Sequence, residues 1–333
     1  MEKQNNKYLQ TEFKTQQENK QRYLMKSKSF VFDNAKFEMF FVEEKQRRMP
    51  SSKVINRCES VKNLFKNIRK DALLYFELNN IVWWKQYEDL YFPNGNTLSS
   101  QIHCLNHLFA IRADHDAVLK IIQTILPDID EIEASPIDEK FCIMDNYPYK
   151  TPSYISFEFT YNNKELLRER CNQRGANCTS VDAFVYAVNK EKKRILIAIE
   201  WKYTEAYEKT DDNKAKEATI DERYRDLAAK KDSNLGGWKE LYNWDPQYEL
   251  ARQTLLMEQI IFNKPFDADN YQHIVVCPND NTEMLADAVA FKDSLEDKSK
   301  FRIIDPQELL SPLRGNDDYK ELLNYLKTRY WNS

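Results

Sequence analysis

The chain has 333 residues, enough for one large domain or two, and 13% of them are aromatic while only five are glycine. So few glycines leave no Gly-rich phosphate loop and no G-x-S-x-G elbow, which excludes P-loop NTPases, kinases, Rossmann oxidoreductases and α/β-hydrolases. No run approaches 18 apolar residues and the N-terminus lacks an apolar signal core, so a soluble, cytoplasmic protein without membrane contact is predicted.

Residues 1–96 are predicted to form a mainly helical, basic and aromatic-rich N-terminal region, followed by a second unit over 97–333. The net charge of the chain is −4, yet residues 1–70 hold 17 Lys or Arg against 8 Asp or Glu. Nine of these basic residues fall within 45–70. Such a stretch is typical of a surface that follows a phosphate backbone, and equally of a solvated helical face.

The rest of the chain alternates between helical and strand-like segments. Ser or Thr at 97–100 opens a helix whose apolar residues recur at helical spacing until Pro127. Alternation over 154–161 predicts a strand with Glu158 on the face opposite Phe157 and Phe159. The segments expected next are strands 181–188 and 194–203, helix 249–261, strand 273–277, helix 282–297, strand 301–304 and helix 317–331. This order predicts a mixed α/β (α+β) fold.

The two strands 181–188 and 194–203 carry charges that a buried sheet does not ordinarily accept. If the polar residues 189–193 form the loop, Val188 pairs with Arg194, and Asp182 then lies opposite Glu200. Opposed side chains are roughly 4.5 to 5.5 Å apart at Cβ, so these two carboxylates repel each other. Lys202 projects from the same face as Glu200. A divalent cation with oxygen ligands, Mg²⁺ or Mn²⁺, would relieve the repulsion.

An acid in one strand followed by acid-x-Lys in the next resembles the active site of the PD-(D/E)XK nuclease superfamily. Val181 stands where the name-giving Pro would be. The resemblance covers roughly 97–280 and is strongest to restriction-endonuclease-like bacterial proteins, through Ser99-Ser100-Gln101 and the block 200–205. It implies a restriction-endonuclease-like αβββαβ core flanked by helices, and a Mg²⁺- or Mn²⁺-dependent endonuclease that hydrolyses DNA in restriction, repair or defence. It also implies a homodimer.

The resemblance assigns roles to particular residues. Asp182, Glu200 and the backbone carbonyl of Trp201 would bind the metal, and Lys202 would orient or activate water and stabilise the phosphate charge. Glu158 is the candidate for a further acid.

Three other residues are weaker candidates for substrate binding. Gln101 stands where the superfamily often places an acid, although N-terminal capping of its helix is the favoured role. Arg252 and Gln253, on the helix after the hairpin, could reach a phosphate or a base, or could lie on a solvated helix face.

Alternatives from other classes stay open. The same fold could be a catalytically silent module that binds nucleic acid or protein, or a nuclease directed at RNA. The three charged residues could also form an ordinary salt bridge on an exposed hairpin. His103 and His107 have the HxxxH spacing of a zinc site, but Cys104 stands where a zincin requires Glu, so a core role is favoured.

Overall fold

The computed structural model describes residues 9–42, 47–84, 92–138, 152–175, 178–210 and 214–331. Its α-helices are α1 (Glu12–Lys26), α2 (Arg69–Leu78), α3 (Ser100–Leu108), α4 (His115–Gln123), α5 (Asn163–Leu166), α6 (Glu217–Arg223), α7 (Arg225–Ala228), α8 (Gln247–Asn263), α9 (Thr282–Ser294), α10 (Pro306–Leu309) and α11 (Lys320–Arg329). Its strands are β1 (Phe37–Val42), β2 (Arg47–Ile55), β3 (Ile129–Glu133), β4 (Ser156–Phe159), β5 (Val181–Asn189), β6 (Arg194–Trp201), β7 (Asn270–Val276) and β8 (Phe301–Ile304).

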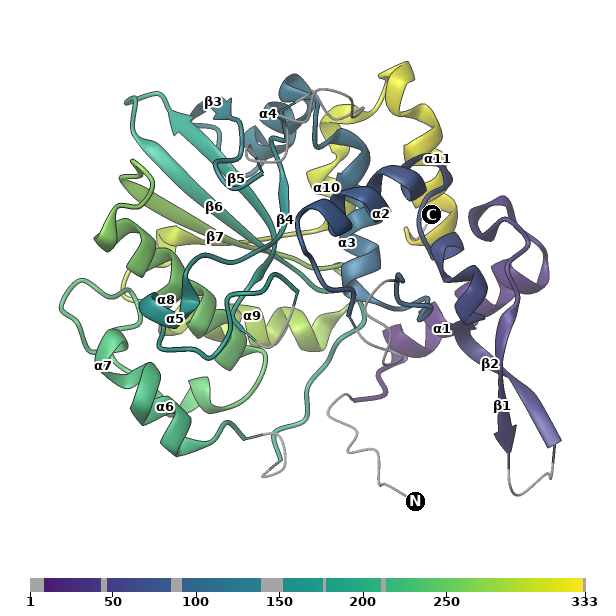
Figure 1. The fold of residues 1–333 in the computed structure, drawn as a ribbon, viewed down its shortest axis with the longest axis horizontal. Helices are drawn as coiled ribbons and strands as arrows, with labels where there is room; N and C mark the ends of the chain where they lie inside the picture. Colours follow the sequence, from purple (N-terminus) through teal and green to yellow (C-terminus); the bar gives the residue numbers. More distant parts are fainter. Residues whose placement is uncertain are drawn as a thin grey trace.

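The centre of the molecule is a six-stranded mixed sheet in the order β3-β5-β6-β7-β8, with β4 also paired to β5 (Figure 1). Strands β3, β4 and β6 run antiparallel to β5, whereas β6, β7 and β8 are parallel. Helices α3, α4 and α11 cover one face of the sheet, and α8 and α9 cover the other. The predicted mixed α/β fold, with a sheet flanked by helices, is confirmed.

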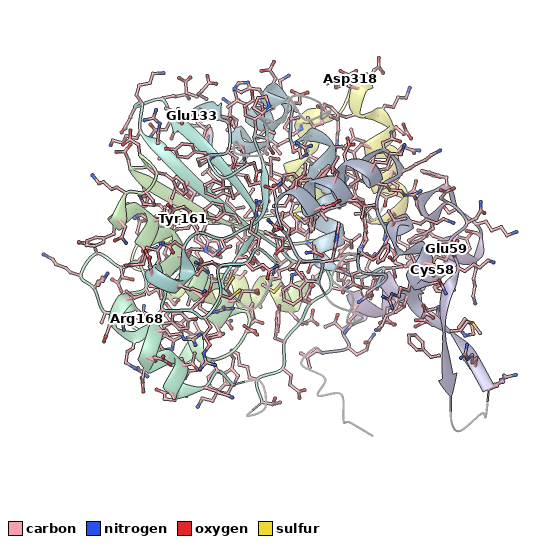
Figure 2. All side chains as sticks on the ribbon, in the orientation of Figure 1. Cys58, Glu59, Glu133, Tyr161, Arg168 and Asp318 are labelled. Carbon is pink, nitrogen blue, oxygen red and sulfur yellow. The ribbon has the colours of Figure 1, made fainter. Side chains whose placement is uncertain are left out.

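Both faces of β6 are buried, which explains its nearly continuous apolar sequence. Ile195, Ile197 and Ile199 pack into the core on the α3 face, and Leu196 and Ala198 pack into the core on the α8 face. The charged residues of the chain are in general at the surface, as Figure 2 shows for the labelled Arg168 and Asp318. Charged side chains at the end of a strand that is buried on both faces, as β6 is, are therefore unusual.

Three local structures differ from the sequence-based expectations. The helix predicted to run to Pro127 is divided into α3 and α4, because the side chain of Asp114 caps a new helix start through Ala117 N–H. Strand β3 was not expected. Besides its helices, the N-terminal region contains the antiparallel ribbon β1–β2, which projects from the body beside α1 (Figure 1).

Side chains from both ends of the chain share one hydrophobic core. Phe13 of α1, Tyr75 of α2 and Leu326 of α11 belong to the same cluster as the sheet residues on the α3 face. The division at residue 96 stays a prediction. Among the residues that the structure describes, no helix combines the length and the apolar composition that a membrane crossing requires.

Candidate active site

The β5–β6 hairpin has the predicted register. Val188 pairs with Arg194, and the pairing continues in step to Ala183 and Ile199. Asp182 follows at the end of this ladder, where its Oδ2 accepts a 2.7 Å hydrogen bond from Trp201 N–H. Trp201 N–H thus donates to a side-chain carboxylate of β5 where a backbone carbonyl would continue the ladder. This bond fixes Asp182 beside the end of β6.

Glu200 and Lys202 converge as expected from their spacing. The Lys202 Nζ lies 2.7 Å from Glu200 Oε1, and both side chains are buried. The ammonium also donates to Glu249 of α8 and, at 3.3 Å, to the hydroxyl of Tyr207. Burial lowers the pKa of Lys202, but Glu200 and Glu249 raise it by more, so it lies well above its ordinary value. Lys202 is therefore a cation at neutral pH. Because Glu200 and Lys202 are buried, the alternative of an exposed hairpin with an ordinary salt bridge is wrong.

Glu158 joins this group from β4. It is buried, and its Oε1 accepts a 2.8 Å hydrogen bond from Gln101 Nε2 on α3. Its backbone is left-handed, with φ of +49°, a conformation that costs energy for a residue with a side chain. This turn also explains why Phe157 and Phe159 pack into different cores, contrary to the predicted alternation.

Gln101 does not cap its helix, because the side chain of Ser99 accepts the capping bond from Ile102 N–H. Gln101 instead bridges two segments: its amide nitrogen binds Glu158, and its oxygen accepts from Trp84 N–H at 3.1 Å. The capping role predicted for it is wrong. Its position beside Glu158 agrees with a place in the site, whereas substrate binding by Gln101 stays a prediction.

Of the two residues suggested on α8, Gln253 reaches the site and Arg252 does not. Gln253 is fully buried, and its Nε2 donates to Glu200 Oε2 at 2.5 Å and to the Ser180 carbonyl at 2.8 Å. Arg252 points to Thr179, at 3.1 Å, and lies 3.8 Å from a carboxylate oxygen of Glu169. Gln253 therefore does not lie on a solvated helix face.

Sequence reasoning missed Glu249, the second carboxylate bound to Lys202. The available signal was its spacing: Glu249 lies four residues before Gln253, so both project from the same face of α8. We refer to Glu158, Asp182, Glu200 and Glu249 as the acidic cluster.

The acidic cluster carries more negative charge than Lys202 neutralises. Burial raises the pKa of Asp182 well above its ordinary value, and the charge of Glu158 adds to this effect. Burial raises the pKa of Glu200 well above its ordinary value too, and the charges of Asp182 and Glu249 raise it further. For Glu158, burial and the charge of Glu200 raise the pKa to about 7, although the Gln101 hydrogen bond lowers it. Ionising Glu158, Asp182 and Glu200 together is therefore costly without further positive charge.

The chemistry of this donor set suits a hard divalent cation, which would supply the missing charge. Within the described ranges, however, no group of three or more His, Cys, Asp or Glu side chains is arranged to hold a metal ion. Both oxygens of Glu200 are engaged, one by Lys202 and one by Gln253. A metal bound to Glu200 would thus have to displace one of these partners.

The histidines of the HxxxH pair are core residues, as favoured from the sequence. His103 and His107 are buried; His103 stacks on Tyr203 with ring centroids 4.1 Å apart and accepts a hydrogen bond from Trp201 Nε1. Burial lowers the pKa of both imidazoles, to about 3 for His107. They are neutral side chains of the packed interior.

A family model described as Restriction Endonuclease associating with ARP matches residues 7–331, nearly the whole chain. A comparison with curated proteins and another with solved structures gave no match. The family match therefore includes the N-terminal region, the acidic cluster and the C-terminal helices.

Proposed function

Because the chain belongs to the family of restriction endonucleases associating with ARP, we propose that it is a metal-dependent nuclease that hydrolyses phosphodiester bonds of DNA. The observation that carries this proposal is the convergence of Asp182, Glu200 and Lys202 at the end of the β5–β6 hairpin, with Glu158 beside them. Buried carboxylates that raise one another's pKa are costly to a fold, and such groups are typical of functional sites.

In this proposal Asp182, Glu200 and the Trp201 carbonyl hold Mg²⁺ or Mn²⁺, with Glu158 as a further acid. The bound ion would polarise the scissile phosphate and lower the pKa of a bound water. Asp182 is suited to this role because the Trp201 N–H hydrogen bond fixes its carboxylate at the start of β5, where the residue is only partly buried.

Lys202 would stabilise negative charge on the phosphate. Its raised pKa makes the ammonium a donor of charge and hydrogen bonds, not a base that removes a proton from water. Glu249 and Tyr207 also bind the ammonium, so it keeps two partners if Glu200 turns to a metal. Glu249 is thereby a positioning residue for Lys202.

The first test of this proposal is cleavage of plasmid, linear and single-stranded DNA, and of RNA, with Mg²⁺ or Mn²⁺. We expect cleavage by the wild type and none by Lys202→Ala or Asp182→Ala. The matched control is Lys192→Ala, which removes an exposed lysine paired with Asp130 at 2.7 Å on the β5–β6 turn. Equal cleavage by the wild type and Lys202→Ala would identify a contaminating enzyme and count against the assignment.

A second measurement separates a nuclease from a silent module. Calorimetric titration with Mn²⁺ should show binding to the wild type and to Lys192→Ala, and its loss in Asp182→Ala. A folded wild type that binds no divalent ion would remove the basis of the proposed chemistry.

The ribbon β1–β2 is the proposed DNA contact. Its base is anchored in the body by the buried Ile55 and by the 2.9 Å ion pair of Lys53 with Glu18. Farther out, Phe40 is 45% exposed, and Arg47 and Arg48 are exposed as well. A two-stranded ribbon fits the major groove of DNA, and adjacent residues of a strand point to opposite faces. Arg47 and Arg48 could therefore reach both sides of the groove.

The ribbon is tested with Arg47→Ala/Arg48→Ala in a DNA-binding titration at several salt concentrations. We expect weaker binding and a loss of about 2 from the slope of log affinity against log salt, since each lost phosphate contact removes about 1. The control is Lys192→Ala/Lys193→Ala on the turn at the other end of the molecule (Figure 1). Unchanged DNA binding with altered self-association would show instead that the ribbon pairs with a second copy of the chain.

A further inference from the structure

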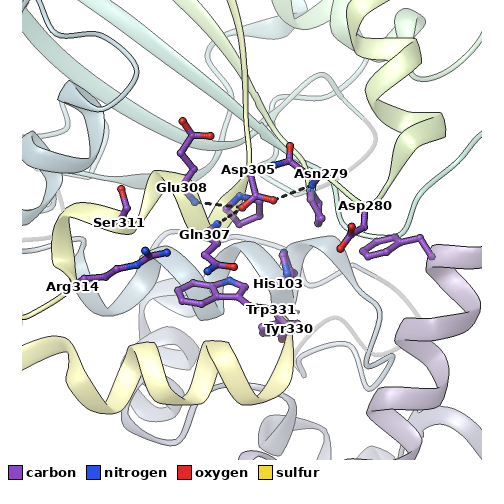
Figure 3. Close-up of a pocket in the computed structure, with 13 residues that line it drawn as sticks. His103, Asn279, Asp280, Asp305, Gln307, Glu308, Ser311, Arg314, Tyr330 and Trp331 are labelled. Carbon is purple, nitrogen blue, oxygen red and sulfur yellow. Dashed lines mark hydrogen bonds between the residues drawn. The ribbon is translucent and has the colours of Figure 1, made fainter. Parts of the chain in front are cut away.

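A cavity of about 430 Å³ lies beside α3, with His103 of that helix in its lining (Figure 3). It lies where β7 and β8 end, between α3, α10, α11 and the start of α1. Ligands commonly bind at the carboxyl ends of parallel strands in α/β proteins, and β7 and β8 are parallel. The volume of the cavity is within the range of small-molecule sites. The lining residues are Phe13, His103, Pro278, Asn279, Asp280, Asp305, Pro306, Gln307, Glu308, Ser311, Arg314, Tyr330 and Trp331.

One wall of the cavity is aromatic and held in place. The indole of Trp331 donates from Nε1 to His107 Nε2 at 3.1 Å, and the Trp331 carbonyl accepts from Lys20 Nζ at 2.6 Å. Tyr330 and Phe13 are buried beside it. Figure 3 shows the Trp331 ring next to the side chains of Gln307 and His103. Such a fixed wall offers a flat stacking surface without ordering on binding.

The floor of the cavity contains the imidazole of His103, and its hydrogen bond shows which ring nitrogen carries the proton. His103 is 1% exposed, and its Nδ1 accepts the hydrogen bond from Trp201 Nε1 at 2.5 Å. An indole N–H can only donate, so Nδ1 carries no proton and the ring is a neutral imidazole. A neutral imidazole that accepts at Nδ1 carries its proton on Nε2. Among the described residues no acceptor bonds this N–H, which leaves it for a ligand in the cavity.

The charges around the cavity limit what the ligand can be. Of the charged side chains that line the cavity, Asp280, Asp305 and Glu308 are acidic and Arg314 is basic, so the lining disfavours a phosphate. Asp305 is turned to the backbone, where it accepts from Asn279 N–H at 2.9 Å and Gln307 N–H at 2.7 Å. An aromatic wall, a buried N–H donor and a side-chain amide match a planar uncharged group with hydrogen-bonding atoms on its edge.

We propose that this cavity binds a nucleobase, stacked on Trp331 and hydrogen-bonded to His103 and Gln307. The base can come from a free nucleoside or from an unpaired nucleotide of a polynucleotide whose phosphates stay outside the acidic rim. The cavity connects to the acidic cluster through Trp201, which binds His103 and lies between Glu200 and Lys202 in the sequence. It is nevertheless separate from that cluster and does not depend on nuclease activity.

The proposal is tested by calorimetric titration of the full chain, without metal, with adenosine, guanosine, cytidine, thymidine and inorganic phosphate. We expect at least one nucleoside to bind and phosphate not to bind. Trp331→Ala should weaken binding about tenfold or more, in line with the loss of a stacking partner. Gln307→Leu, which keeps the backbone bond to Asp305, serves as a second variant if Trp331→Ala does not fold.

Two controls separate this site from other effects. Phe262→Ala removes a ring that is 72% exposed on α8, away from the cavity lining, and should leave the affinity unchanged. Asp182→Ala, which disables the proposed nuclease, should also bind the nucleoside as the wild type does. Failure of the nuclease proposal is thereby distinguished from failure of this one.

A short single-stranded oligonucleotide identifies the source of the base. If Trp331→Ala weakens oligonucleotide binding, the base belongs to a polynucleotide; if it weakens nucleoside binding alone, the ligand is a free nucleoside. Both results support the site. Binding of phosphate in preference to nucleosides would overturn it, as would affinities for every nucleoside and for the oligonucleotide that do not change in Trp331→Ala and Gln307→Leu.

Discussion

Replacing Glu158 by Gln should stabilise the metal-free protein at neutral and alkaline pH. The folded protein holds the pKa of Glu158 at about 7, against an ordinary value of 4.5. The folded state therefore binds the proton of Glu158 more tightly than the unfolded chain does. The contribution of Glu158 to the free energy of unfolding is fully present below pH 4.5 and is lost as the pH rises to about 7. The loss amounts to about 3 kcal/mol. The Glu158→Gln variant avoids it, and its side-chain amide can still accept the hydrogen bond from Gln101.

The assay is urea unfolding of the wild type and Glu158→Gln in EDTA at a series of pH values from the ordinary pKa of Glu to above neutrality. We expect equal free energies of unfolding at the acid end and a growing advantage of the variant toward alkaline pH. Asp182 and Glu200 titrate in both proteins, and because the charge of Glu158 raises the pKa of Asp182, the variant also removes that repulsion at alkaline pH. A difference that is constant with pH would show that Glu158 does not change its protonation in this range and would refute the reasoning. Saturating Mg²⁺ should reduce the advantage if Glu158 faces a bound ion.

The remaining predictions concern stability away from titration, and urea unfolding at neutral pH measures each of them. Gln253→Leu should lower the free energy of unfolding by about 2 to 4 kcal/mol, because Glu200 and the Ser180 carbonyl lose their hydrogen bonds to the amide. A loss below about 1 kcal/mol would contradict the hydrogen bond between Gln253 and Glu200. Gly175→Ala should cost over ~2 kcal/mol, since its Cβ would lie 2.3 Å from the Val82 carbonyl oxygen at φ of +69°. Gly315→Ala has a similar φ of +85° but open space, so it should cost clearly less; equal losses would show that the close approach to Val82 is not the cause.

The register of the β5–β6 hairpin could be predicted because local features determine it. A polar loop between two apolar strands leaves one pairing that keeps the isoleucines of β6 on one face, and a one-residue shift would exchange the side chains that face α3 with those that face α8. The positions of Asp182, Glu200 and Lys202 follow directly from that register. The metal, the substrate and the homodimer stay predictions.

Contacts that depend on packing between distant segments could not be predicted in the same way. Glu249 and Gln253 meet β6 because of the angle at which α8 crosses the sheet, which no local pattern specifies. The left-handed backbone of Glu158 is equally invisible in an alternating strand pattern. Strand β3 was missed because acidic residues, Asp130 and Glu131, occupy both of its exposed positions.

The end of β6 joins two features of the molecule that differ in chemistry. Glu200 points to the α8 face, where burial and neighbouring carboxylates leave it short of positive charge, while the next residue, Trp201, points to the α3 face and binds a neutral histidine. Consecutive residues of a strand point to opposite faces, so the two features share a strand end but no side chain. Asp182 binds only the backbone N–H of Trp201, whereas His103 binds the indole Nε1. Removing the Asp182 carboxylate therefore leaves the indole and its bond to His103 in place, which is why Asp182→Ala can test the two proposals separately.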